Sequence, residues 1–336
     1  MTKSERRNLR NGLLFISPWV VGFGVFMLYP ILASLFFSFC DYSVLEPPVW
    51  WGVENYTELY QDSVFWQSLG NTGVYAGISL PLGMFVALSL AILLNTKVRG
   101  MTVYRTIFFL PSIVPIVAMA ILWLWIFNGQ YGVLNYALRP LVEAYNAATA
   151  PVLPWVNAAL GALDAAVRWV GSLVGMRVSW PYRAVPAVLP AWLDSPFWAK
   201  PALIVMGLWG VGYAVVIYLA GLQDIPVSLY ESADIDGASW WQKTVHITIP
   251  MLSPVIYFNL VMGIIGTFQI FAAPYIMTNG GPERATTFYT LYLYDLAFED
   301  LRMGYACAMA WILFVIILAL TLVATKVSQR HVHYER

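Results

Sequence analysis

Three carboxylates gather in one short polar segment of an otherwise apolar chain. Glu231, Asp234 and Asp236 lie within YESADIDGASWWQKTVHITIP, residues 230–250. No metal-binding pattern such as HExxH and no nucleophile–base grouping accompanies them, so neither metal chemistry nor covalent catalysis is indicated. Two interpretations fit the residues alone. The segment is either a solvated surface helix or an acidic helix that inserts into a groove on a cytoplasmic partner.

The same segment contains signals for two short helices. Ser228 and Glu231 have the spacing of a capping box, which predicts a helix that begins at Leu229. Gly237 can adopt the left-handed conformation that ends a helix. The sequence therefore predicts a helix of barely two turns followed by a tight turn.

A second helix is predicted to follow the turn and to lead into the next apolar segment. It runs through Trp240, Trp241 and Val245, and Pro250 marks the beginning of that apolar segment. Lys243 is the single basic residue beside four carboxylates at positions 224, 231, 234 and 236. The predicted unit is a compact, acidic helix–turn–helix.

The composition defines the environment in which this unit must lie. The chain has 336 residues, of which 60% are hydrophobic and 11% charged, whereas a soluble domain has about 25% charged residues. The formal net charge of zero leaves no basic face for nucleic acid. Cys40 and Cys307 form no CxxC pair and are interpreted as small buried residues. The chain is predicted to be an integral membrane protein.

Six apolar segments lack Asp, Glu, Lys and Arg, and each approaches or exceeds the ~20 residues that cross a bilayer as a helix. They are Leu13–Phe39, Thr72–Leu94, Thr106–Phe127, Ala202–Gln223, Met251–Met277 and Met303–Thr325. The first segment is too long for a cleaved signal peptide and is expected to be retained. The predicted fold is an all-α integral membrane protein with six transmembrane helices.

The distribution of basic residues predicts the orientation of these spans. With the N-terminus inside, eleven Lys and Arg residues lie on the inner side and seven on the outer side, as the positive-inside rule requires. Residues 1–12 and 326–336 are then cytoplasmic tails of a six-span domain at 13–325. The acidic segment, taken as residues 224–250, is cytoplasmic, and the long connection at 128–200 is an outer insertion.

That outer insertion contains an apolar stretch that could pass for a seventh span. Asp164 and Arg168 lie near its middle, and each costs roughly 2.5–3.5 kcal/mol at a bilayer centre. Polar or small residues recur every three to four positions there: Asn157, Gly161, Asp164, Arg168 and Ser172. The pattern predicts an amphipathic helix on the outer surface or against the other helices. Docking of an external partner and an inert insertion both remain open as its role.

The acidic segment resembles the EAA loop of the membrane subunits of binding-protein-dependent ABC importers. That family has Glu-Ala-Ala, three residues, Gly, and a distal Ile-x-Leu-Pro. Here E-S-A-D-I-D-G and I-T-I-P match it at Glu231, Gly237 and Pro250, with mild departures at Ser232 and Ile249. The pattern lies between two predicted spans on the cytoplasmic side, as the family requires.

The resemblance extends over nearly the whole chain. Asn71-Thr72, R-T-I-F-F-L-P before the third span, M-T-N-G-G-P at 277–282 and Y-D-L-A-F at 294–298 are similar to the carbohydrate-uptake branch, which includes sugar, glycerol-phosphate and maltose permeases. The middle of the outer insertion departs by its length. The resemblance implies a multi-pass protein of the prokaryotic inner or plasma membrane. It also implies three partners: a second homologous permease, a dimeric cytoplasmic ATPase and an extracytoplasmic sugar-binding protein.

The resemblance also implies roles for five residues of the loop. Glu231 anchors the helix on the ATPase, Gly237 sets the turn and Ala233 allows close approach, while Asp236 and Pro250 complete the coupling segment. The resemblance assigns ATP and Mg²⁺ to the partner ATPase, and no lysine of this chain follows a GxxxxG stretch, so the sequence contains no P-loop. The chain itself is predicted to be neither an enzyme nor a cofactor-binding protein.

The predicted carbohydrate path lies among the helices that flank the loop. Polar and aromatic candidates in the fourth and fifth spans are Trp209, Tyr213, Thr267 and Gln269. Hydrogen bonds to neighbouring helices are the alternative role for each of them. An ion-coupled secondary transporter of a small polar solute is the alternative function. It is disfavoured because no span contains an ionisable carboxylate, Lys or Arg. A membrane enzyme is disfavoured by the lack of a catalytic grouping.

Overall fold

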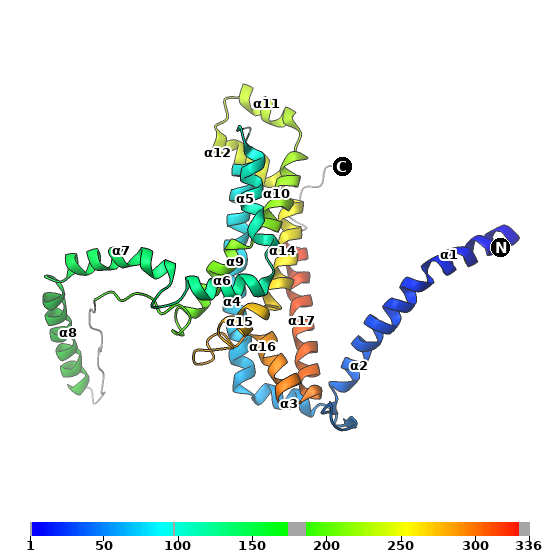
Figure 1. Cartoon of the computed structure of the whole chain (residues 1–336), viewed down its shortest axis with the longest axis horizontal. Helices are drawn as coiled ribbons and strands as arrows, with labels where there is room; N and C mark the ends of the chain where they lie inside the picture. The colour runs from blue at the N-terminus through cyan, green and yellow to red at the C-terminus, as the bar shows by residue number, and fades with distance from the viewer. Residues whose placement is uncertain (1, 97, 174–185, 329–336) are drawn as a thin grey trace.

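The computed structural model describes residues 2–96, 98–173 and 186–328. The regular secondary structure within these ranges is helical apart from a short antiparallel hairpin of β1 (Cys40–Asp41) and β2 (Val49–Trp50). A central helical bundle carries one arm on each side (Figure 1). The middle of the predicted outer insertion and the end of the predicted C-terminal tail lie outside the described residues.

The first half of the chain contains both arms. Its helices are α1 (Lys3–Phe23), the π-helical η1 (Gly24–Leu28), α2 (Tyr29–Phe37), α3 (Glu54–Gln61), α4 (Ser63–Leu94), α5 (Met101–Ile113), α6 (Ile116–Ile126), α7 (Val133–Thr149) and α8 (Leu153–Leu173). A capping box of Thr2 and Glu5 opens α1. The Asp62 carboxylate accepts a hydrogen bond from the Val64 amide and caps α4.

The second half of the chain completes the bundle. Its helices are α9 (Ala199–Trp209), α10 (Gly212–Gln223), α11 (Val227–Ile235), α12 (Trp240–Lys243), the π-helical η2 (Thr244–Thr248), α13 (Ile249–Met251), α14 (Ser253–Phe268), α15 (Ala272–Met277), α16 (Tyr289–Tyr294), the π-helical η3 (Asp295–Glu299) and α17 (Met303–Ser328). The long helix α4 packs against α9, α10, α14 and α16, and α14 also packs against α17. Buried apolar side chains, among them Tyr218, Leu252 and Met309, fill these contacts. The bundle has α11 at one end and α3 at the other (Figure 1).

The six apolar segments predicted as spans are mainly helical, and two of them are sharply bent helix pairs. The described residues contain four helices long and apolar enough to cross a membrane, and up to seven if each of three bent pairs is one span. Helices α5 and α6 meet at 97°, and α9 and α10 at 46°. Val114 is extended, with ψ of 127°, because the following Pro115 disfavours the helical conformation of the residue before it. The predicted third and fourth spans are therefore bent.

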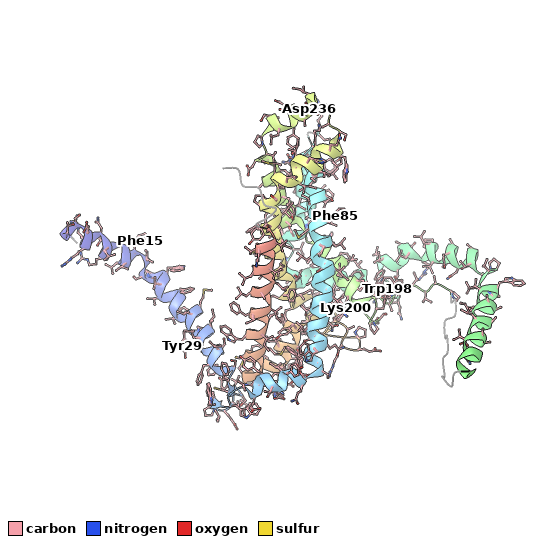
Figure 2. The ribbon with its side chains drawn as sticks, turned by 180° about the vertical axis from the view of Figure 1, so that it is seen from behind. Phe15, Tyr29, Phe85, Trp198, Lys200 and Asp236 are labelled. Carbon is pink, nitrogen blue, oxygen red and sulfur yellow. The ribbon has the colours of Figure 1, made fainter. Side chains whose placement is uncertain are left out.

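The N-terminal arm of α1, η1 and α2 extends away from the bundle. Its side chains are exposed along most of its length, and Phe15 is 90% exposed. Figure 2 shows Phe15 and Tyr29 on this arm, well separated from the helices of the bundle. The arm joins the bundle where α2 packs against α17, and Trp311 Nε1 donates to Ser34 Oγ at 3.2 Å.

The second arm is formed by α7 and α8, which meet at 66°. The helix predicted around Asp164 and Arg168 is present in α8, where the two residues form an ion pair one turn apart and Asp164 is 9% exposed. The additional helix α7 was not predicted. Asn135 fastens it to the returning chain by accepting from Trp192 Nε1 at 2.8 Å and donating to the Pro190 carbonyl at 3.0 Å.

A polar network holds the α3 end of the bundle together. The Asp62 carboxylate accepts hydrogen bonds from the Tyr292 hydroxyl at 2.6 Å and the Tyr305 hydroxyl at 3.0 Å, and Arg302 pairs with Glu58 at 2.6 Å. Burial raises the pKa of the Asp62 carboxyl, but the hydrogen bonds that it accepts outweigh burial and hold this pKa below its ordinary value. The network joins α3, α4, α16 and the start of α17.

Candidate functional site

The α11 end of the bundle is the acidic segment singled out from the sequence. Helix α11 begins directly after Pro226 and has no side-chain cap, so the predicted capping box at Ser228 and Glu231 is wrong. Pro226 fixes its own φ near the helical value and stands immediately before the first turn, which places both residues inside the helix. The capping box is formed one helix later, where Ser239 and Gln242 open α12.

The turn after α11 has the geometry predicted for Gly237. Its φ is +72°, a left-handed value that glycine adopts without steric cost. The Gly237 amide donates to the Asp234 carbonyl at 3.1 Å, and the Ala238 amide donates to the Ala233 carbonyl at 2.9 Å. These two bonds form a Schellman motif. The prediction that Gly237 ends the first helix is confirmed.

Two side-chain contacts fasten α11 to the helical run that follows it. Lys243 Nζ lies 2.5 Å from Asp234 Oδ1, and the Tyr230 hydroxyl lies 2.9 Å from Thr248 Oγ1. The Tyr230 ring also packs against the buried cluster that contains Tyr218 and Leu252. That run passes through α12, η2 and α13, which contains Pro250, into α14. A displacement of α11 would therefore be transmitted to α14.

The surface of this unit is both acidic and apolar. Glu231 and Asp236 are exposed, Ala233 is half-buried, and Figure 2 shows Asp236 at the tip of the molecule. Ile235 is 88% exposed, and the exposed Trp240 and Trp241 rings lie 5.9 Å apart. Exposed aromatic and aliphatic side chains beside charges are typical of a protein-docking surface.

A cavity of about 450 Å³ lies among α4, α9, α10 and α14. Tyr213 and Thr267 line it, as predicted for a substrate path, whereas Trp209 and Gln269 do not. The Trp209 ring lies 6.0 Å from Trp123 in an edge-on contact, and Gln269 is exposed just beyond the end of α14. The structure therefore brings together one pair of the four predicted residues.

Three further polar residues line the cavity and were not predicted. They are Tyr75 and Ser79 on α4 and Asn259 on α14. Asn259 lies eight residues before Thr267, so the helical repeat places both on one face. That spacing was visible in the sequence. Tyr75 and Ser79 lie on α4, the second predicted span, whereas the predicted path used the fourth and fifth spans only. Every other described residue that lines the cavity is apolar or glycine.

A helical membrane protein with a cavity among its helices and an exposed acidic helix–turn–helix at one end is the class that these features define. Residues 79–333 match the family of binding-protein-dependent transport system inner membrane components, and the chain belongs to this family. It is the membrane-spanning permease subunit of a binding-protein-dependent ABC importer. This membership displaces the alternative of an ion-coupled secondary transporter.

Individual relatives match over almost the full length of the chain. The probable ABC transporter permease protein YesP of Bacillus subtilis is 37% identical, covering 99% of this chain and 95% of the relative. The lactose transport system permease protein LacF of Rhizobium radiobacter is 33% identical, covering 96% of each. A crystal structure of a bacterial ABC transporter involved in the import of the acidic polysaccharide alginate has a similar fold, with a TM-score of 0.74, 24% identity and coverage of 98% of this chain and 99% of that chain.

Proposed function

We propose that the chain forms the translocation path for a carbohydrate and couples this path to a separate ATPase through the EAA loop at 224–250. One observation carries the proposal: α10 and α14, the two helices that flank the loop, also line the cavity. A rigid-body displacement at α11 therefore acts directly on cavity walls. The relatives that transport lactose and trehalose or maltose support a carbohydrate substrate.

The cavity chemistry supports an uncharged carbohydrate. No charged side chain lines it among the described residues, while tyrosine, serine, threonine and asparagine supply hydroxyl and amide groups. Sugars are bound by such groups and by aromatic faces, and a buried neutral hydrogen bond contributes about 0.5–1.5 kcal/mol. A carboxylated sugar would have to be desolvated here without a basic partner among the described residues that line the cavity.

The loop supplies the contacts for the ATPase. Glu231 and Asp236 offer carboxylates to basic side chains of the partner, and Ile235 offers an exposed apolar anchor. Gly237 sets the turn, Ala233 leaves room for a close approach, and Pro250 joins the unit to α14. Nucleotide and Mg²⁺ are assigned to the ATPase, so this chain performs no catalysis.

The partners follow from the same proposal. A second permease completes the path, an extracytoplasmic binding protein delivers the sugar, and lipid surrounds the spans. A structure similar in fold is a bacterial alginate ABC transporter in complex with an alginate pentasaccharide-bound periplasmic protein. The exposed apolar side chains of the N-terminal arm offer surface to the second permease and to lipid.

Reporter fusions are expected to show six spans with both termini in the cytoplasm of a prokaryotic cell. Fusions at Arg99, Lys243 and Lys326 should report the inside, and fusions at Glu54 and Glu283 the outside. If α7 and α8 together crossed the membrane as a seventh span, the fusion at Lys243 would report the outside. Such a result would contradict the coupling role of α11. A fusion at position 177, outside the described residues, should also report the outside.

Substitutions in the cavity are expected to reduce uptake by a few-fold. Tyr213→Phe and Thr267→Val each remove one hydroxyl from the lining, which corresponds to about 0.5–1.5 kcal/mol of lost substrate binding. Gln269→Leu is the matched control, because Gln269 does not line the cavity. Uptake of a panel of labelled sugars, with the complex quantified on a gel, measures the effect.

Two outcomes of the uptake assay would contradict this assignment of the path. An unchanged uptake and substrate range in the Tyr213→Phe, Thr267→Val double variant would place the path elsewhere. A failure of the complex to assemble would assign these hydroxyls to helix packing instead. Recovery of an ATPase and a second permease with the tagged wild-type chain is the simplest test of the partner assignment.

A further inference from the structure

The chain between α15 and α16 is a loop bonded to itself by three threonines. Thr278 Oγ1 lies 2.6 Å from Thr286 Oγ1, the Thr286 hydroxyl donates to the Gly281 carbonyl at 2.6 Å, and the Thr287 hydroxyl donates to the Gly280 carbonyl at 3.1 Å. All three threonines are buried or half-buried. This loop, residues 278–288, should therefore move as one body.

The loop and the first residue of α16 are fastened to α4 by two adjacent polar residues. Asn71 Nδ2 donates to the Arg284 carbonyl at 2.8 Å and to the Thr287 carbonyl at 3.0 Å, across 213 and 216 positions of sequence. Thr72 Oγ1 accepts from the Tyr289 amide at 2.9 Å. Asn71 is 8% exposed and Thr72 is fully buried. Both amide hydrogens of Asn71 are thus committed to the loop in a site that water barely reaches.

The same loop places an aromatic ring against a wall of the cavity. Phe288, the last loop residue, is fully buried, and its ring lies 5.1 Å from that of Tyr75. Tyr75 lies one turn of α4 beyond Asn71 and, of the α4 residues that line the cavity, is the one nearest α3. Phe288 and Tyr75 belong to one buried cluster with Ile204 and Met277. Tyr75 and Ile204 of this cluster also line the cavity, so Phe288 packs directly behind a cavity wall.

We propose that Asn71 is a positioning residue that keeps the cavity closed toward the α3 end by holding Phe288 against Tyr75. The inference rests on the proposed function in taking the cavity as the path and the α3 end as external. Opening the cavity outward then requires the loop to leave α4. The two carbonyls lose their Asn71 donor together in that step, which makes the closure an all-or-none contact rather than a gradual one.

The substitution Asn71→Asp tests the role of the two donors. It keeps the size of the side chain but removes both amide hydrogens and sets a carboxylate against two carbonyl oxygens. Asn95→Asp is the matched control, since it makes the same change at the opposite, exposed end of α4. The probe is Ser79→Cys, a near-isosteric thiol on the cavity wall, treated with a membrane-impermeant maleimide on intact spheroplasts that contain the whole complex. The parent without Ser79→Cys gives the background from Cys40 and Cys307.

Labelling of the Ser79→Cys thiol is expected to become at least about tenfold faster with Asn71→Asp, because two buried hydrogen bonds are lost, and to stay unchanged with Asn95→Asp. Equal rates in the Asn71→Asp and parent proteins would overturn the proposal. If Asn71→Asp does not assemble, Phe288→Leu in the same assay decides, since it removes the Tyr75 ring contact while retaining an apolar side chain. Slow labelling in that variant would also overturn it. The labelling assay contains no sugar. A wrong carbohydrate assignment would therefore appear in the uptake assays and leave the labelling rates unchanged.

Discussion

Gly237→Pro is expected to abolish uptake while the protein still inserts in the membrane. Proline fixes φ near −65°, whereas Gly237 has φ of +72°, and proline lacks the amide that donates to the Asp234 carbonyl. Proline cannot form this turn, because it fixes φ outside the left-handed region and removes one of the two Schellman bonds. The turn should therefore reorganise and displace α11. Uptake into cells and recovery of the ATPase with the tagged chain measure the result.

Gly237→Asn is the control for this substitution. Asparagine visits the left-handed region more readily than other non-glycine residues, so this variant should retain most of the uptake. Glu231→Lys tests the surface rather than the turn. Glu231 is exposed and lies in the second turn of α11, so charge reversal should leave the fold intact and weaken docking alone. Normal uptake in both Gly237→Pro and Glu231→Lys would refute the role of the loop.

The local signals near Gly237 show how much of the EAA loop at 224–250 could be predicted from sequence. The left-handed turn was predictable because glycine is the residue that tolerates positive φ. The first residue of α11 was not predictable in this way. Ser228 and Glu231 have the spacing of a capping box, but Pro226 determines where the helix starts. The ties from Lys243 to Asp234 and from Tyr230 to Thr248 were not predictable either. They depend on how the two helices fold back on each other.

The predicted spans also show that local sequence locates helices but does not determine how they bend and pack. Apolar runs located the membrane helices, since crossing a bilayer requires about 20 apolar residues. They did not predict the bends, although Val114-Pro115 is a local signal for the bend between α5 and α6. In the cavity, hydropathy could nominate Tyr213 and Thr267 but could not separate them from Trp209 and Gln269. Which face of a helix meets a cavity is set by its neighbours, not by its own sequence.

Thr267→Trp is expected to block transport without disturbing assembly. Thr267 lines a cavity of about 450 Å³, and its hydroxyl donates within α14, to the Gly263 carbonyl at 2.8 Å and the Ile264 carbonyl at 3.3 Å. An indole at this position would project into the proposed sugar path, rather than into a packed core where overpacking costs about 1–3 kcal/mol. Uptake should fall to background, while the ATPase and the second permease still copurify.

Gln269→Trp provides the matched control, because the same bulk is added two residues farther along, at an exposed position that does not line the cavity. Its uptake should remain close to that of the wild type. ATP turnover by the purified complex with loaded binding protein separates the two ways in which Thr267→Trp could act. Turnover that persists without uptake indicates a blocked path, because the α11 unit lies at the far end of α14 and is untouched. Normal uptake in Thr267→Trp would show that the sugar does not pass through this cavity.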